Sequence, residues 1–254
     1  MNKIQRYKHE LEVSYALGAT LTFELVKSRP EWVTRVFLRS SLEETEGTRR
    51  LRELCGSRGI PCETNDKAFN ILSPKGNCYV IGEFRKTKLR LNEGSHIVLV
   101  NPSDAGNLGT ILRTAAGFGI NDIAIIRNAV DFYDPKTIRS SMGAAFHVRA
   151  EIFDSIQDYC GRFPRNERYA FMLKGSVPIT EVRIREPYSL IFGNEATGLP
   201  EEYARFCTPV VIRHSDSIDS LNLPMAAGIA MYEFTKSRWR AGTGDGSPGP
   251  ADRG

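Results

Sequence analysis

Apolar residues follow two patterns along the chain, and these patterns predict its secondary structure. From residue 96 onward, short apolar runs such as "HIVLV" (96–100) and "YSLIF" (188–192) alternate with longer stretches of helical spacing such as "NLGTILRTAAGFG" (107–119). Runs that are apolar throughout are typical of strands buried on both faces. Strands that alternate with helices predict a parallel sheet covered on both sides. We therefore expect an α/β domain over residues 97–240.

The same patterns set the expected elements of this domain. Strands are predicted at 96–100, 122–128, 148–153, 168–174, 188–195 and 209–214. Helices are predicted at 107–119, 134–146, 155–163, 199–206 and 221–240.

The first ninety residues have a mixed pattern that predicts a separate small α/β domain over 1–90. Residues 2–29 have helical spacing interrupted at Gly18, with further helices expected at 42–59 and 67–74. Strands are expected at 33–40, 60–66 and 78–85. Turn residues close the basic stretch Arg85–Ser95, and we place a linker at 91–96. The Gly- and Pro-rich segment 241–254 is expected to be disordered.

Composition indicates an ordinary soluble globular protein, with 41% hydrophobic and 25% charged residues. The apolar runs are too short to span a bilayer, and the first residues lack the apolar core of a signal peptide. We therefore expect a cytoplasmic protein with no membrane partner. The five cysteines show no zinc-ligand spacing, so no metal site is predicted.

Charge is unevenly distributed along the chain. Residues 1–95 carry 17 Lys and Arg against 12 Asp and Glu, whereas residues 96–254 carry 17 against 18. This excess suits a nucleic-acid-facing module beside a neutral one, although an ordinary solvated surface would look the same. The candidate phosphate contacts are Arg35, Arg39, Arg49, Arg50, Arg52, Lys86, Lys88 and Arg90.

The first segment with candidate chemistry is "NLGTILR" (107–113), which follows the strand 96–100. It lacks both the GxxxxGK[ST] of a P-loop and the GxGxxG of a dinucleotide-binding oxidoreductase. On a helix beginning near Asn107, Gly109 and Arg113 share a face close to Asn107. The amide and the guanidinium are then expected at the carboxyl ends of the strands, where open parallel sheets bind ligands. Alternatively, Asn107 only caps the helix and Arg113 lies on its surface.

Two further segments place polar residues after buried strands. In "SLIFGNEATGLP" (189–200), Glu195 directly follows a strand, where a carboxylate costs free energy unless it is paired or functional. Its alternative role is to stabilise the start of a helix. In "SLN" (220–222), Ser220 or Asn222 is expected to cap the last helix, with Pro224 in its first turn.

These three segments together resemble the SpoU/TrmH-type RNA ribose 2′-O-methyltransferases of the SPOUT superfamily. The family shows N-[LV]-G-x-x-x-R, then G-x-E-x-x-G, then S-L-N, and this chain has "NLGTILR", "GNEATG" and "SLN" in that order. The resemblance covers residues 97–240. The first ninety residues resemble more weakly an RNA-binding domain akin to small ribosomal proteins. The chain departs from the family in having "NLP" for "NVS" and Ile212-Arg213 for Ile-Pro.

The resemblance implies a carboxyl-terminal trefoil knot, a homodimer packed through it, and S-adenosyl-L-methionine as cofactor. It implies RNA as substrate, ribosomal RNA more than transfer RNA; a non-catalytic RNA-binding protein on the same fold is the alternative. The residues expected to hold the cofactor are Gly193, Ile212 and Leu221. The residues expected to be catalytic are Asn107, Arg113, Glu195, Ser220 and Asn222. Among these, Glu195 is expected to hold its loop or to pair with Asn107.

Overall fold

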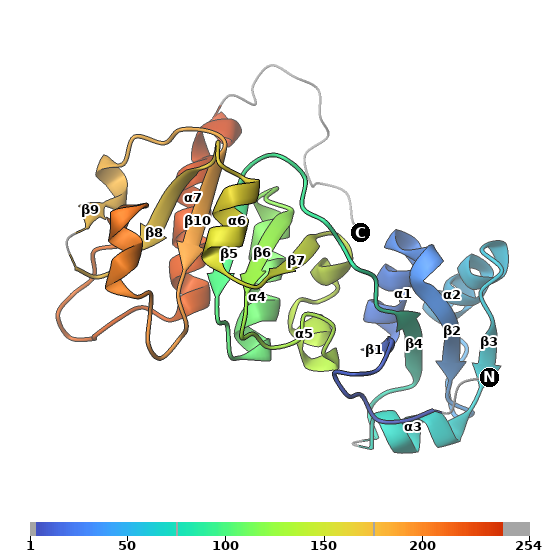
Figure 1. The fold of residues 1–254 in the computed structure, drawn as a ribbon. Helices are drawn as coiled ribbons and strands as arrows, with labels where there is room; N and C mark the ends of the chain where they lie inside the picture. Colours follow the sequence, from blue (N-terminus) through green and yellow to red (C-terminus); the bar gives the residue numbers. More distant parts are fainter. Residues whose placement is uncertain (1–3, 75, 175, 241–254) are drawn as a thin grey trace.

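The structure, a computed structural model, describes residues 4–74, 76–174 and 176–240 and contains two β-sheets that lie side by side (Figure 1). The segment 241–254, which we expected to be disordered, lies outside the described residues. None of the helices in the described ranges combines the length and the apolar character needed to cross a membrane.

The first sheet is small and mixed. Its strands are β1 (Val13–Leu17), β2 (Val33–Leu38), β3 (Cys62–Thr64) and β4 (Val80–Arg85), in the order β1-β4-β2-β3. The pairs β1–β4 and β2–β4 are antiparallel, and β2–β3 is parallel. The accompanying helices are α1 (Ala19–Ser28), the 3-10 turn η1 (Pro30–Trp32), α2 (Glu46–Ser57) and α3 (Asp66–Leu72).

The prediction of a helical segment over residues 2–29 was wrong in its first half. Val13–Leu17 forms the edge strand β1, and the helix begins only after Gly18, whose φ of 117° ends the strand. The apolar residues of "VSYAL" fit either period over so short a run. Antiparallel pairing with β4 decided between them.

The second sheet has seven strands, all parallel to their neighbours, in the order β7-β6-β5-β10-β8-β11-β9. The strands are β5 (His96–Val100), β6 (Asp122–Ile126), β7 (Arg149–Phe153), β8 (Glu167–Phe171), β9 (Val177–Pro178), β10 (Tyr188–Phe192) and β11 (Thr208–Val211). This arrangement confirms the predicted α/β class with a parallel sheet. The short edge strand β9 was not predicted, and His96, the last residue of the expected linker, begins β5.

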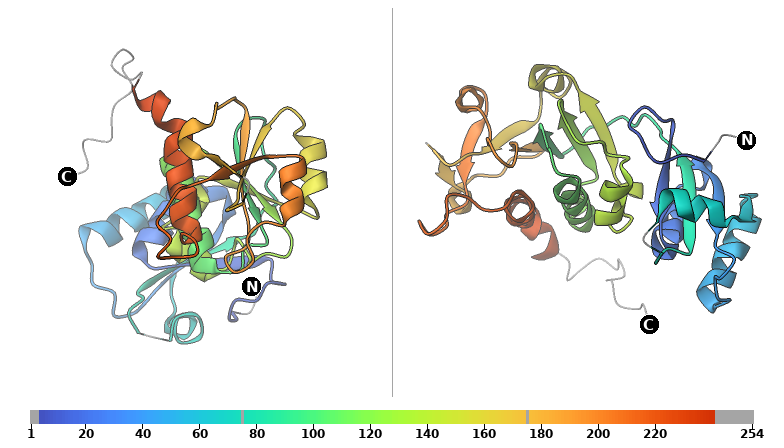
Figure 2. Two further views of the ribbon diagram at one scale, coloured as in Figure 1. Left: turned by 90° about the vertical axis from the view of Figure 1, so that its left-hand side faces the viewer. Right: turned by 90° about the horizontal axis from the view of Figure 1, so that it is seen from below.

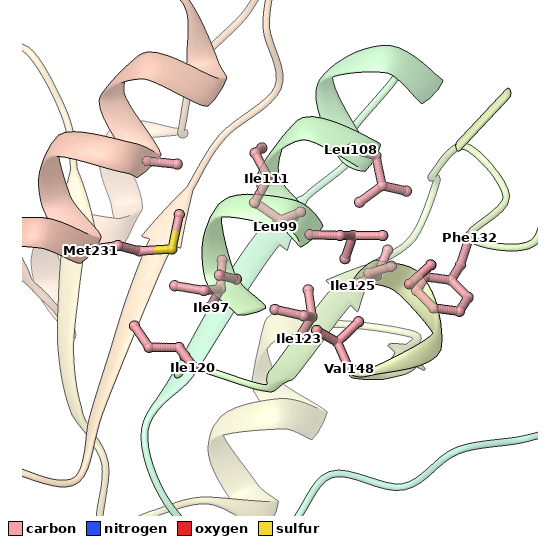
Figure 3. Close-up of a cluster of buried hydrophobic side chains, with 14 of the residues drawn as sticks. Ile97, Leu99, Leu108, Ile111, Ile120, Ile123, Ile125, Phe132, Val148 and Met231 are labelled. Carbon is pink, nitrogen blue, oxygen red and sulfur yellow. The ribbon is translucent and has the colours of Figure 1, made fainter. Parts of the chain in front are cut away.

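Helices cover both faces of the parallel sheet. The helices are α4 (Ala105–Gly117), α5 (Pro135–Ser140), α6 (Ile156–Arg162) and α7 (Leu223–Arg240), with 3-10 turns η2 (Ala144–Phe146), η3 (Ile179–Glu181) and η4 (Glu201–Arg205). Alternate residues of the strands face opposite ways: Ile97 and Leu99 pack with α4 and α7, as Figure 3 shows. Val98 and Val100 pack with α6 on the other face.

Two predicted helices are shorter or tighter than expected. The stretch 134–146 is divided into α5 and η2, because Met142 and Gly143 have φ values of 52° and 87° and interrupt the helix. The stretch 199–206 forms the 3-10 turn η4 in place of an α-helix.

We call the first sheet with its helices and flanking segments, residues 4–90, the first module. It packs against the part of the chain that forms the parallel sheet through apolar side chains, in addition to the connecting segment. Trp32 and Phe84 of the first module belong to the same buried cluster as Phe146, and the rings of Phe84 and Phe146 meet edge to face at 5.5 Å. Polar contacts add to this interface, since Arg29 Nε donates to the carbonyl of Phe146 at 2.9 Å. β1 and α1 of the first module contact α5 and η2, and Figure 2 shows the two sheets side by side.

Candidate functional site

The candidate site forms where two neighbouring parallel strands end. β5 and β10 pair in register from His96↔Ser189 to Leu99↔Phe192, so their carboxyl ends lie at the same edge of the sheet. The segments that follow them, 101–107 and 193–199, therefore run beside each other. This is the edge at which open parallel sheets bind ligands.

Asp104, not Asn107, caps the amino end of α4. Asp104 Oδ1 accepts a hydrogen bond from the backbone N–H of Asn107 at 2.8 Å. The expected start of the helix near Asn107 was therefore two residues late, and the alternative that Asn107 is the cap is wrong. Because the cap is supplied elsewhere, the Asn107 side chain is available for another contact.

Glu195 joins the two segments at this edge. Its carboxylate accepts hydrogen bonds from Asn107 Nδ2 (3.1 Å), from the N–H (3.1 Å) and Oγ (2.8 Å) of Ser103, and from the N–H of Asp104 (3.3 Å). Burial acts to raise the pKa of Glu195, but these hydrogen bonds outweigh it and hold the pKa below its usual range. Glu195 is therefore a structural acceptor in its ionised form.

The loop that carries Glu195 is tightly closed. A Cβ atom on Gly193 would lie 2.2 Å from the carbonyl carbon of Gly198, so only glycine fits there. Asn194 Oδ1 accepts from the N–H of Ala196 at 2.9 Å, and Asn194 Nδ2 donates to the carbonyl of Asn101 at 2.8 Å. These contacts fasten the loop both to itself and to the end of β5.

Gly109 and Arg113 have different surroundings on α4, although the sequence placed them on one face. A Cβ on Gly109 would lie 2.6 Å from both Ser140 Cβ and the carbonyl oxygen of Thr137, so Gly109 is where α5 crosses α4 closely. Arg113 is exposed and makes no hydrogen bond or ion pair with any described residue. Its guanidinium is thus available to a ligand.

The third segment does not join the Asn107–Glu195 contact through hydrogen bonds. Ser220 and Asn222 are exposed, and neither side chain hydrogen-bonds to a described residue. α7 begins at Leu223, so Asn222, not Ser220, occupies the position before the helix, and its carbonyl accepts from the N–H of Ala226 at 3.0 Å. Packing brings this helix to α4, where Gly228 lies against Thr114, the residue next to Arg113.

The three residues predicted to hold a cofactor lie in different settings. Gly193 is in the closed loop after β10, Ile212 is half-buried against the main apolar cluster after β11, and Leu221 is half-buried before α7. His214, which the sequence reasoning did not select, lies between the last two, and its Nε2 is buried without a hydrogen-bond partner among the described residues.

Sequence reasoning also missed Ser103 and Asp104, which supply most of the donors to Glu195. A signal was present for Asp104, since an acid three residues before Asn107 at the start of an apolar-periodic stretch is typical of a helix cap. No local signal identifies Ser103, because its partner is far away in the sequence.

A cavity of about 680 Å³ opens elsewhere, at the amino ends of the parallel strands. Its walls include the ion pairs Arg149–Asp122 and Arg238–Glu186, each with a contact of 2.5 Å. None of the predicted site residues lines it. The described residues contain no group of three or more His, Cys, Asp or Glu side chains placed to hold a metal ion.

The fold and the site together define an α/β protein of the parallel-sheet class with polar loops gathered at the carboxyl edge of its strands. Residues 94–232 match the model of the SpoU rRNA Methylase family, and the chain belongs to this family.

Individual relatives extend the comparison. The chain is 32% identical over 150 residues to an uncharacterized tRNA/rRNA methyltransferase of Synechocystis, which covers 58% of this chain and 55% of the relative. It is 28% identical over 150 residues to a 23S rRNA (uridine(2479)-2′-O)-methyltransferase of Streptomyces viridochromogenes, covering 56% of this chain and 52% of the relative. The matches thus span about half the length of these curated relatives.

A solved structure resembles the chain over most of its length. The AdoMet-bound rRNA methyltransferase of Sinorhizobium meliloti is 26% identical, with a TM-score of 0.75 over 89% of this chain and 88% of that one. The similarity therefore includes the first, smaller sheet as well as the parallel one.

Proposed function

We propose that the protein is an S-adenosylmethionine-dependent RNA ribose 2′-O-methyltransferase. The observation that carries the proposal is the contact between Asn107 and Glu195, which come from two separate motifs 88 residues apart and meet at 3.1 Å at the ligand-binding edge of the sheet. Membership of the SpoU rRNA Methylase family supports the same activity.

Gly193, Ile212 and Leu221 would hold the cofactor. Half-buried Ile212 and Leu221 offer apolar walls of the kind an adenine ring needs. The buried, unpartnered Nε2 of His214 on the same segment fits a site that contributes a polar contact to a ligand. The Sinorhizobium meliloti relative binds AdoMet, which supports this choice of cofactor.

The chain's own part in the reaction is to bind and orient the ribose and to stabilise its oxygen. When bound, the cofactor supplies an electrophilic methyl group on a sulfonium. A ribose 2′-hydroxyl is a weak nucleophile at neutral pH, so the developing alkoxide needs stabilisation. Arg113, exposed and unpaired among the described residues, would bind a substrate phosphate and stabilise that charge. Since an arginine stays protonated in proteins, it is a poor candidate for a proton acceptor.

The remaining predicted residues would act around Arg113. Asn107, held by Glu195, and Asn222, which precedes α7, would orient the ribose and Arg113. Ser220 would complete the cluster when substrate is present. Ribosomal RNA is the proposed substrate, because the family model and the Streptomyces viridochromogenes relative are both described by ribosomal RNA. Transfer RNA is the second candidate, because the description of the Synechocystis relative names both kinds of RNA.

We also propose that the protein is a homodimer. The exposed apolar side chains Met225, Ile229, Tyr232 and Trp239 share one side of α7. Exposed apolar side chains that gather on one surface mark interaction sites. A second copy of this chain is the proposed occupant. We further propose that the carboxyl-terminal part of the chain forms the expected trefoil knot. The proposed domain boundaries are 1–90 for the small domain, 91–96 for the linker and 97–240 for the methyltransferase domain.

The test replaces Arg113 by Ala and measures methyl transfer from radiolabelled S-adenosylmethionine. The methyl acceptor is total RNA from cells that lack the gene, because their RNA does not carry the methyl group that this protein adds. The variant should lose at least about 100-fold in rate, as expected for removal of a charge stabiliser, while it binds the cofactor and melts as the wild type does. Arg205→Ala, on η4 at the opposite face of the sheet, is the matched control and should be fully active. A wild-type protein that binds no S-adenosylmethionine would instead support the non-catalytic RNA-binding alternative.

A further inference from the structure

The first module carries an exposed aromatic side chain that the proposed function does not use. Tyr79, just before β4, is 44% exposed. The Arg39 guanidinium lies 5.7 Å from the centre of its ring and 5.7 Å from that of Phe69. Arg39 Nη1 also donates to the carbonyls of Gly76 (3.0 Å) and Cys78 (3.4 Å). Arg39 thus lies over both rings, and its hydrogen bonds to the two carbonyls hold it beside Tyr79.

Helix α5 links this surface to the candidate site. At its start, Lys136 Nζ reaches Asp104, the cap of α4, at 3.4 Å. Both side chains of this pair are largely exposed, so a phosphate can replace Asp104 as the partner at little cost. α5 lies between α4 and β1, and so it spans the distance from the site to the first module (Figure 1).

Arg139, three residues further along α5, is exposed and has no hydrogen bond or ion pair with a described residue. Arg39 lies beside Tyr79, and α5, which carries Arg139, packs against β1. Leu17 of β1 pairs with Ile81 of β4, the strand that Tyr79 precedes, so α5 lies on the side of the first sheet where Tyr79 enters it. One acid, Asp66, also lies near Arg39, and its two oxygens accept hydrogen bonds from Ser40 at 2.8 and 2.6 Å.

We propose that Tyr79 with Arg39, together with Arg139 and Lys136, forms a track that binds single-stranded RNA and leads it to Arg113. This proposal rests on the proposed RNA methyltransferase function. Cations spaced along a surface contact the phosphates, and an exposed ring stacks on a base. Only an unpaired base offers its face to such a ring, so the track selects single-stranded RNA or a loop over a duplex. Of the eight cations predicted from sequence, only Arg39 belongs to this track. Among the others, Arg35 pairs with Glu83 and Lys86 with Asp131.

The test measures the binding of a fluorescein-labelled oligouridylate of about 15 nucleotides by anisotropy at several salt concentrations. Tyr79→Ala should weaken binding about tenfold and leave the salt dependence unchanged, because stacking releases no counterions. Tyr79→Phe keeps the ring and should bind as the wild type does. Arg139→Ala should lower the slope of log affinity against log salt by about 0.7, the value for one phosphate contact to a single strand. Arg205→Ala should change neither quantity.

The proposal is wrong if the wild type does not bind the single strand, if a duplex of equal length binds better, or if Tyr79→Ala and Arg139→Ala bind like the wild type. Cofactor binding is measured by calorimetry on the same preparations. Intact S-adenosylmethionine binding with unaltered RNA binding in the variants rejects the track alone. A wild-type protein that does not bind S-adenosylmethionine rejects the methyltransferase proposal instead. Melting temperatures check that each variant is folded.

Discussion

At the scale of single residues, Glu195 shows how a partly buried carboxylate is kept ionised by donors from another segment. Ser103, Asp104 and Asn107 all donate to it. Sequence reasoning selected Glu195 and Asn107 because an acid after a buried strand and an amide at a helix start both require an explanation. It missed Ser103, whose small polar side chain is ordinary in any loop.

We predict that Glu195→Gln lowers the free energy of unfolding by about 1 kcal/mol at pH 7, because one oxygen is replaced by an amide group that faces donors. The pKa of Glu195 is depressed in the folded state, so its contribution to stability is present above the usual carboxyl range near 4.5 and is lost as the pH falls through the folded value. Denaturant unfolding of wild type and variant, from about pH 3 to about pH 7, measures the difference in unfolding free energy.

The difference between the two proteins should therefore shrink toward low pH. Glu202→Gln, at an exposed site on η4, is the control and should not change stability. A Glu195 effect that is equally large at both ends of the pH range would show that the carboxylate charge is not what stabilises the loop.

At the scale of elements, α7 has two different sides. Ala227, Ala230, Met231 and Phe234 are buried in the main cluster, whereas Met225, Ile229, Tyr232 and Trp239 are exposed. The sequence predicted the helix from its apolar character but did not separate these two sides, since both are apolar. Packing against α4 and β10 decided which residues are covered.

If a second copy covers the exposed side, Ile229→Glu should convert the dimer to a monomer, because an unpaired charge would be buried in the interface. Sedimentation equilibrium of the variant measures its mass. Ser237→Glu lies on a different side of α7 and should remain dimeric. A wild type that sediments as a monomer at every concentration would contradict the proposed dimer.

At the scale of the whole molecule, Asp131 fastens the two modules together. It accepts hydrogen bonds from Tyr7 Oη, from His9 Nδ1 at 2.8 Å and from Lys86 Nζ at 3.0 Å, all contributed by the first module. Burial acts to raise the pKa of Asp131, but the hydrogen bond from Tyr7 and the other donors outweigh it and leave the pKa lowered.

We predict that Asp131→Asn lowers the free energy of unfolding by about 1–3 kcal/mol at neutral pH, because it leaves the half-buried Lys86 without its charge partner. The depressed pKa means that this contribution is present above the usual aspartate range near 3.8 and disappears as the pH falls through the folded value. Calorimetric melting of wild type and variant at several pH values measures it. Asp154→Asn removes an exposed ion pair and should have little effect. Equal losses in the two variants would contradict a special role for Asp131.

The sequence by itself determined the strand and helix periods beyond residue 96, and thereby the parallel sheet, because an apolar run must be buried wherever it lies. It also determined which polar residues follow the strands. Only the tertiary structure decided that Asn107 meets Glu195, that Asp104 supplies the cap, that Gly109 lies under α5 and that Val13–Leu17 is a strand. These outcomes depend on which strands pair and which helices cross, and a local stretch of sequence carries no information about a partner that is distant along the chain.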